Sequence, residues 1–366
     1  MKFNIAPILN NFRCKGNLFE TKIHKIGHIH DTYIAVFQKE DGKFQRYLLQ
    51  HINHHVFKAP TELMENIHNV TSHLREKIAA AGGDPARETL TLVPTKEGKH
   101  FLKTSAGDYW RAYLFIENAQ AYEAIKSLDH VYHTSRAFGK FQRLLRDFPA
   151  ERLHETIPGF HHTPKRFEAF MAAAKKDSQN RARFVGEEIG FVKARANDTP
   201  VLVDLIQQEK LPLRVTHNDT KFNNVLIDNE TGEGICVVDL DTVMPGLSLY
   251  DFGDSIRSGA NPASEAERDL SLVQVDLNRF EAFVHGYLDA TRDFLTPLEI
   301  DLLPFSAKLM TFECGIRFLT DYLQGDIYFK TDHESHNLDR TRTQFKLVAD
   351  IESKFEQLGE IVEKYR

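Results

Sequence analysis

VTHNDTKFNNVLI occupies residues 215–227, and VVDLD follows at residues 237–241. The apolar, β-branched runs at both ends predict strands, and the polar residues between them predict a short loop that the strands hold rigid. Two carboxylates and one amide, those of Asp219, Asp239 and Asn224, are therefore expected to lie close together on one strand–loop–strand unit.

Such a set of side chains suits phosphoryl transfer. The reaction needs a carboxylate that accepts the proton of the attacking hydroxyl or orients it, and oxygen ligands that hold Mg²⁺ against the nucleotide phosphates. Asp219 is the expected base, and Lys221 is expected to pair with the transferred phosphate. Asn224 and Asp239 are the expected Mg²⁺ ligands, at the spacing of the protein-kinase catalytic loop. Asp241, on the same side of an extended segment, is expected either to bind a second ion or to shape the site.

Other polar residues near this unit are expected to support it. His217 is expected to pack and to hydrogen-bond the loop backbone. The triplet DFG at residues 251–253 matches the metal-binding motif of kinases, but it lies too far from Asp219 for one hairpin to join them. Asp251 and Asp254 follow a loop that enters a helix, so we expect them to cap that helix or to fix the loop.

Residues 23–50 alternate in the manner of three strands joined by turns. Gly27 lies in the first turn, where backbone N–H groups can approach a phosphate, although an ordinary hairpin has the same pattern. Gln50 ends the third strand, at the position where a kinase carries its phosphate-pairing lysine. It is neutral and offers an amide hydrogen bond instead. Glu65, on the helix that follows Pro60, is expected either to orient this residue or to face solvent.

The order of these elements predicts two lobes. Residues 90–93 and 108–116 read as strands that complete a mostly antiparallel first lobe, and most of the later chain has helical periodicity. We place the boundary at residue 117, between a nucleotide-binding lobe of residues 1–117 and a catalytic and substrate-binding lobe of residues 118–366. The predicted fold class is α+β, in a two-lobed, protein-kinase-like arrangement.

Two loops have contrasting expected roles. The connector around Phe115 and Glu117 is expected to offer backbone N–H and C=O groups to the adenine edge of ATP. The loop at residues 149–164 contains His154, His161 and His162. No helical pair with a carboxylate accompanies these histidines, so we expect them to be solvated rather than metal-bound.

Composition excludes several other classes of protein. The net charge of -6 and pI near 6.3 argue against a nucleic-acid partner, which would require a basic face. The three cysteines form neither a disulfide framework nor a metal-ligand spacing, which favours a reducing compartment. The start lacks the apolar segment of a secretory signal, and no apolar run approaches a membrane span. We therefore expect a cytoplasmic protein with no membrane partner.

Several motifs together resemble the aminoglycoside phosphotransferase group of the protein-kinase-like fold. Within that group they are most similar to the bacterial N-acetylhexosamine 1-kinases. The resemblance extends over nearly the whole chain. The motifs are GHIHDTY at residues 27–33, YLFIE at 113–117, THNDTK at 216–221, DLDTVMPG at 239–246, YDFGD at 250–254 and CGIRFLTDYLQGDIY at 314–328.

The resemblance implies ATP- and Mg²⁺-dependent phosphorylation of the anomeric hydroxyl of N-acetylglucosamine or N-acetylgalactosamine. It assigns Asp219 to that hydroxyl, implies that glutamine is usual at the position of Gln50, and implies a further set of sugar-binding residues. Arg317 could instead form a salt bridge with Asp321, one helical turn away. The implied sugar-binding residues are His28, Asp31, Thr32, Arg317 and Tyr328.

Two alternative functions remain open from the residues alone. One is a kinase of another small alcohol, such as homoserine or choline, although a choline site requires an aromatic cage that Trp110 does not obviously supply. The other is a nucleotide-binding module without activity, which the neutral Gln50 would suit. The intact set of Asp219, Asn224 and Asp239 opposes the second alternative.

Overall fold

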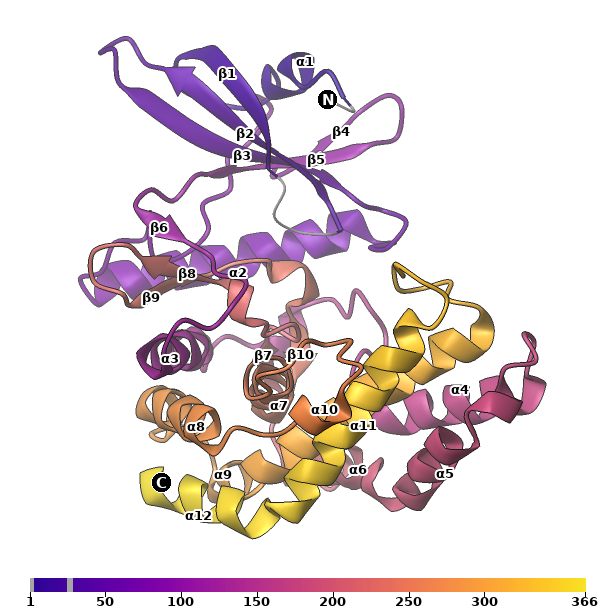
Figure 1. Ribbon diagram of the computed structural model, residues 1–366. Coiled ribbons are helices and arrows are strands. Elements are labelled where there is room, and N and C mark those ends of the chain that lie inside the picture. The colour runs from indigo at the N-terminus through magenta and orange to yellow at the C-terminus, as the bar shows by residue number, and fades with distance from the viewer. Residues whose placement is uncertain (1–2, 25–28) are drawn as a thin grey trace.

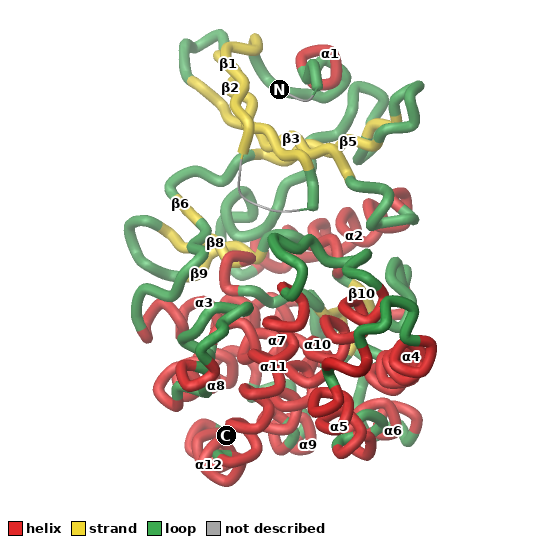
Figure 2. The backbone as a smooth tube through the Cα atoms, turned by 45° about the vertical axis from the view of Figure 1, so that its right-hand side comes forward, coloured by secondary structure: helices red, strands yellow, loops and turns green. Residues whose placement is uncertain are grey.

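The computed structural model describes residues 3–24 and 29–366, which form two lobes (Figure 1). Gly27 and His28, expected at the phosphate and sugar sites, lie outside the described residues. The first lobe contains a five-stranded antiparallel sheet, and the second is mostly helical (Figure 2). The predicted two-lobed α+β architecture is therefore confirmed.

The sheet of the first lobe has the strand order β1-β2-β3-β5-β4. β-Branched and aromatic residues favour these strands, and Gly42 allows the tight turn between β2 and β3 with a positive φ of 79°. The elements of this lobe are α1 (Ala6–Leu9), β1 (Asn17–His24), β2 (Asp31–Gln38), β3 (Phe44–Ile52), α2 (Pro60–Ala80), β4 (Leu102–Lys103) and β5 (Tyr109–Leu114).

The two faces of this sheet carry different side chains. Gln50 of β3 is paired with Arg111 of β5, and the next residue, His51, is paired with Trp110. Because successive side chains of a strand point to opposite faces, Gln50 and Arg111 share one face and His51 and Trp110 share the other. Trp110 packs in the core that includes α1, whereas Arg111 contacts α2 and the second lobe. The sheet therefore presents Gln50 and Arg111 toward the lobe junction.

Helix α2 connects the cores of the two lobes. Its predicted apolar face is buried and consists of Leu63, Ile67, Val70 and Leu74. The same core cluster continues into the second lobe, where it includes Val225 and Val243. Burial of this shared face fixes the first lobe on the strands that carry the polar loop.

The predicted strand at residues 90–93 is wrong. The N–H of Val93 donates to the carbonyl of Ala112, 2.8 Å away, but the next N–H on that side, that of Thr95, donates to the carbonyl of Lys99 instead of continuing the ladder. The segment therefore borders the sheet without forming a regular strand. The strand predicted at residues 108–116 is β5, with shorter bounds.

Short strands in the second lobe carry the polar loop as predicted. β7 (Arg214–Thr216) pairs with β10 (Met244–Gly246), and β8 (Val225–Asp228) pairs with β9 (Gly234–Val237) and β6 (Ala119–Gln120). An added Cβ at Gly246 would lie 2.4 Å from Thr216 Oγ1, so only glycine allows this approach of β10 to β7. The chain between β5 and β6 joins the lobes, and the expected boundary falls within it.

Helices make up the remainder of the second lobe. α3 packs against α8, and α10 packs against both α7 and α11 (Figure 1). Among the described residues, no helix combines the length and the apolar character that crossing a bilayer requires. The helices are α3 (Leu128–Leu144), α4 (Thr163–Lys176), α5 (Gly186–Ala194), α6 (Val201–Gln207), α7 (Ser248–Gly259), α8 (Leu277–Thr291), α9 (Pro297–Asp301), α10 (Leu303–Gln324), α11 (His336–Ser353) and α12 (Phe355–Tyr365). Short 3₁₀ helices are η1 (Ala150–Arg152), η2 (Ala182–Phe184), η3 (Ala196–Asp198), η4 (Phe222–Asn224), η5 (Leu240–Thr242) and η6 (Leu270–Leu272).

Candidate active site

His217 links the polar loop to the strand that follows it. Its Nε2 lies 2.8 Å from the carbonyl oxygen of Val238, just after β9, and its Nδ1 lies 3.2 Å from the backbone nitrogen of Asp219. The ring is fully buried and packs edge-on against Phe138. These contacts give His217 the structural role that the sequence predicted.

Two carboxylates of α7 fix the backbone of the loop. Asp251 accepts hydrogen bonds from the N–H groups of His217 and Asn218, at 2.9 and 2.8 Å, and Asp254 accepts one from Thr220 at 2.9 Å. Burial raises the pKa of the Asp251 carboxyl, although these donors act in the opposite direction. The predicted loop-fixing role of Asp251 and Asp254 is therefore confirmed.

Asp219, Lys221 and Asn224 lie together on this fixed loop. Lys221 Nζ is 2.9 Å from Oδ1 of Asp219, and Asn224 Nδ2 donates to the carbonyl oxygen of Asp219 at 2.8 Å. Loss of water around the ammonium group lowers the pKa of Lys221, but the negative charges of Asp219 and Asp254 outweigh this effect. The net result is a raised pKa of Lys221. The Asp219 side chain keeps about a quarter of its surface exposed, so a hydroxyl group can reach its carboxylate.

Asp239 follows β9 in a left-handed conformation, with φ of 60°. The N–H of Val238 donates to the carbonyl of Asn224 at 2.9 Å, which holds the end of β9 beside the loop. Asp239 is exposed to solvent. Neighbouring protein groups nevertheless displace water from its carboxylate, and this effect, together with the negative charges of Asp241 and Asp219, raises its pKa well above the ordinary value. Among the described residues, no lysine or arginine forms an ion pair with Asp239.

These features fit a magnesium site that is completed by a nucleotide. A cation beside Asp239 would offset the repulsion among the carboxylates, and the side-chain oxygen of Asn224 is an oxygen donor of the kind that Mg²⁺ accepts. In the described part of the chain, no three His, Cys, Asp or Glu side chains gather as a metal site. The protein alone would thus supply few ligands, which suits an ion that retains phosphate oxygens and waters.

Asp241 is engaged in a different way from Asp239. Arg111 donates from Nη1 to Oδ1 and from Nη2 to Oδ2, the second at 2.7 Å, and His30 Nε2 lies 2.9 Å from Oδ2. Arg111 and His30 hold the pKa of Asp241 well below its ordinary value, against the effect of burial. Because both carboxylate oxygens are occupied, the contacts differ from the expected metal-ligand role and favour the alternative that Asp241 shapes the site.

Gln50 faces the same junction from β3. Its Oε1 accepts from Arg111 Nε at 2.9 Å, and its Nε2 donates to Oγ1 of Thr32 at 3.3 Å. Glu65 of α2 does not reach Gln50 but pairs with His154, 2.7 Å away, on the exposed side of the helix. The alternative in which Glu65 orients the third strand is therefore wrong.

The connector residues are engaged mainly with other side chains of the first lobe. The Phe115 ring lies beneath the guanidinium of Arg46, whose carbon is 4.0 Å from the ring centre. Glu117 forms an ion pair with Arg46 through its carboxylate and accepts a hydrogen bond from Arg87 through its carbonyl oxygen. These contacts fix the shape of the expected adenine-binding segment.

Arg317 of α10 lies between aromatic side chains. Its guanidinium carbon lies 5.1 Å from the ring centre of Phe160 and 5.6 Å from that of Phe329. Asp321, the alternative partner, instead accepts the backbone N–H groups of residues 327–329. The Asp321 salt bridge is therefore wrong, and among the described residues no carboxylate forms an ion pair with Arg317. Tyr328, on the same loop as Phe329, is largely exposed.

His161 lies in the site, and the prediction that it is solvated is wrong. The ring is buried, with Nδ1 2.8 Å from Glu313 Oε1 and Nε2 3.3 Å from the carbonyl of Asn218. Glu313 also accepts from Thr163 at 2.6 Å and lies one turn before Arg317 on α10. The polar loop is thus tied to the helix that carries Arg317. The two neighbouring loop histidines are partly exposed.

Asp31 lies apart from the polar loop. It pairs with His51 across β2 and β3, and its Oδ2 is 3.4 Å from Nδ1 of that residue. The ring of His51 packs at a tilt against Trp110, on the face of the sheet that packs with α1. The contact with His51 places Asp31 on the face of the sheet opposite to Gln50 and Arg111, and no contact among the described residues joins it to Asp219.

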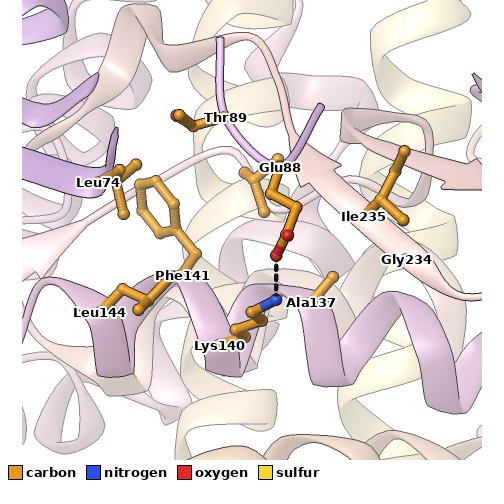
Figure 3. Close-up of a pocket in the computed structure, with 10 residues that line it drawn as sticks. Leu74, Glu88, Thr89, Ala137, Lys140, Phe141, Leu144, Gly234 and Ile235 are labelled. Atoms are coloured by element: carbon orange, nitrogen blue, oxygen red, sulfur yellow. Dashed lines mark hydrogen bonds and ion pairs between the residues drawn. The ribbon is translucent and has the colours of Figure 1, made fainter. Parts of the chain in front are cut away.

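A small cavity lies elsewhere, among α2, α3 and β9 (Figure 3). Its volume is about 20 Å³, which is room for roughly one water molecule and too little for a nucleotide. Lys140 and Glu88 form a 2.6 Å ion pair beside it. This cavity is therefore a packing feature rather than a substrate site.

Comparisons with known proteins identify the family and the fold. A sequence model described as the phosphotransferase enzyme family matches residues 26–292. Solved structures with the same fold include a spectinomycin phosphotransferase in complex with ADP and spectinomycin (14% identity, 96% of this chain, 98% of that chain, TM-score 0.60). Another is a microcompartment-associated aminopropanol kinase (14% identity, 96% of this chain, 97% of that chain, TM-score 0.58). A third is a Plasmodium vivax ethanolamine kinase (15% identity, 89% of this chain, 82% of that chain, TM-score 0.56). At these identities the structures establish the kinase-like fold alone.

Proposed function

Because this chain belongs to the phosphotransferase enzyme family, we propose that it transfers the γ-phosphoryl group of ATP to the anomeric hydroxyl of an N-acetylhexosamine. The observation that carries the proposal is the loop on which Asp219, Lys221 and Asn224 lie in mutual contact, next to the carboxylate of Asp239, with which no lysine or arginine of the described residues forms an ion pair. The ADP bound to the related spectinomycin phosphotransferase supports ATP as the phosphoryl donor.

Each residue of the loop has a defined part in this reaction. The Asp219 carboxylate accepts the proton of the attacking hydroxyl, or holds that hydroxyl in line with the phosphorus atom. Lys221 offsets the charge of the transferred phosphoryl group. Asn224 and Asp239 would hold Mg²⁺, which when bound screens the negative charge of the phosphates. His217 and Asp251 keep the loop backbone in place, so these groups need little rearrangement as the reaction proceeds.

The acceptor site is proposed from the surroundings of Arg317. A guanidinium without an acidic partner is costly to hold among aromatic side chains unless a ligand satisfies its donors. Hydroxyl and amide oxygens of an N-acetylated sugar can accept these hydrogen bonds, and the exposed ring of Tyr328 offers a face against which a hexose can stack. His161 and Glu313 set the position of Arg317 relative to Asp219.

A kinase of another small alcohol is the main alternative, since similar structures include aminopropanol and ethanolamine kinases. Those two acceptors carry a positive charge at neutral pH. The guanidinium of Arg317, with which no carboxylate of the described residues forms an ion pair, would repel a cationic acceptor. Its position therefore favours a neutral or anionic alcohol over an amino alcohol.

The experiment is a panel of acceptors with ATP and Mg²⁺, followed by nuclear magnetic resonance of the product. N-acetylglucosamine and N-acetylgalactosamine are compared with ethanolamine, choline and homoserine. We expect phosphate on O1 of at least one N-acetylhexosamine. Phosphate on O6, or turnover of an amino alcohol instead, would refute the proposed acceptor, and nucleotide binding without any turnover would favour an inactive module.

A further inference from the structure

Asp241 of the second lobe is held by two side chains of the first lobe. Arg111, from the inner face of β5, donates through both terminal nitrogens, and His30, just before β2, approaches within 2.9 Å. The side chains of Arg111, Asp241 and His30 are only 2, 3 and 6% exposed. A buried bidentate ion pair therefore crosses the lobe junction next to Asp239.

Arg111 supplies a positive charge beside Gln50, where β3 has a neutral side chain. Gln50 is neutral, and in the antiparallel register it lies directly beside Arg111, to which it offers Oε1 at 2.9 Å. The Gln50 amide oxygen thus binds the Nε–H of Arg111, and the two terminal nitrogens of the guanidinium bind Asp241. At this pair of positions the positive charge belongs to β5 and not to β3.

The carboxylate that binds Arg111 comes from the second lobe and not from helix α2. On α2, Arg111 contacts the sulfur of Met64 at 4.0 Å, whereas the neighbouring Glu65 turns outward to His154. Helix α2 therefore supplies no carboxylate to the inner face of the sheet through these residues. The carboxylate comes from η5, the turn that directly follows Asp239.

We propose that Arg111 is a positioning residue that holds η5, and with it the Asp239 carboxylate, in the orientation that a metal–nucleotide complex requires. Arg111 also offsets the charge of Asp241, so that the repulsion among the acidic groups does not displace Asp239. It acts through Asp241, which is thereby a positioning residue too. The inference rests on the phosphotransferase assignment but not on the identity of the acceptor.

The test compares ADP binding by calorimetry with and without Mg²⁺, in the absence of any acceptor. In Arg111→Gln and in Asp241→Asn, we expect the gain in ADP affinity on adding Mg²⁺ to fall by about 10–100-fold, while metal-free ADP binding changes little. Arg111→Lys retains the charge but not the two-pronged contact, so its loss should be intermediate. Because the two residues act as a unit, the double variant should lose little more than either single variant.

Arg195→Gln is the matched control, since Arg195 forms a comparable two-pronged ion pair with Glu352 far from the lobe junction. It should lower the melting temperature without changing the effect of Mg²⁺ on ADP affinity. A folded Arg111→Gln protein with the wild-type Mg²⁺ effect would overturn the proposal. Additive losses in the double variant would also overturn it, because they would show that Arg111 and Asp241 act independently.

Discussion

The Glu313 carboxylate lies 2.8 Å from Nδ1 of His161, and both side chains are buried. The other nitrogen of His161 lies 3.3 Å from the carbonyl of Asn218, immediately before Asp219. Helix α10 is therefore connected to the polar loop through one imidazole. Any change in this pair affects both the stability of the second lobe and the position of Arg317.

Replacement of Glu313 by alanine should destabilise the protein strongly. It leaves His161 Nδ1 and the Thr163 hydroxyl without their buried acceptor, and each buried polar group left without a hydrogen-bond partner costs about 1–3 kcal/mol. Glu313→Gln retains an amide oxygen as acceptor and should cost less. Urea denaturation measures both free energies of unfolding, and an alanine variant as stable as the wild type would contradict this account.

Asp251→Ala should reduce turnover by changing the shape of the loop. Two backbone N–H groups, those of His217 and Asn218, and the amide of Gln142 lose their shared acceptor. A shift of about 1 Å in a catalytic group can cost about 100-fold in rate, so we expect kcat to fall by at least that factor in the folded fraction. Steady-state kinetics with circular dichroism would check both points. Wild-type kcat in a folded variant would contradict the loop-fixing role.

Arg317→Gln should weaken binding of the acceptor without weakening binding of ATP. A hydrogen bond to a charged group contributes about 1.5–3 kcal/mol, so the KM for the sugar should rise by about 10–100-fold. Stability should change little, because no ion pair is lost. The matched control is Arg183→Gln, which removes an arginine stacked on the exposed Phe184. An unchanged sugar KM in Arg317→Gln would remove Arg317 from the site.

The lowered pKa of Asp228 should make the protein less stable at acidic pH. The N–H of Thr231, the guanidinium of Arg87 and the N–H of Glu230 lower its pKa from 3.8 to about 2. A carboxyl with a lowered folded pKa contributes stability above pH 3.8, and this contribution is lost as the pH falls toward 2. The melting-temperature difference between wild type and Asp228→Asn should therefore be constant from pH 7 to 5 and shrink below pH 4. A difference that is independent of pH would contradict this assignment.

The local part of the site could be predicted because one short unit carries it. His217, Asp219 and Asn224 belong to a single strand–loop–strand segment, and regular strand geometry fixes where such side chains meet. The role of Asp251 followed from its position at the start of a helix. The lobes followed from the change between strand and helix periodicity.

The long-range pairs could not be predicted from spacing. Arg111 and Asp241 are 130 positions apart, and His161 and Glu313 are 152 apart. No periodicity links residues at such separations, and only the packed fold brings them together. One signal was available for Arg111, since a charged residue in an apolar strand requires a partner. The loop histidines carried no such signal, and His161 was misassigned for that reason.

We infer that Asp219 activates the acceptor hydroxyl and has little part in binding ATP. The direct test is Asp219→Asn, with kcat measured for the best acceptor and the dissociation constant measured for ADP with Mg²⁺. We predict that kcat falls by about 10²–10⁴-fold while the ADP dissociation constant stays close to that of the wild type. A variant that retains the wild-type kcat would contradict the claim.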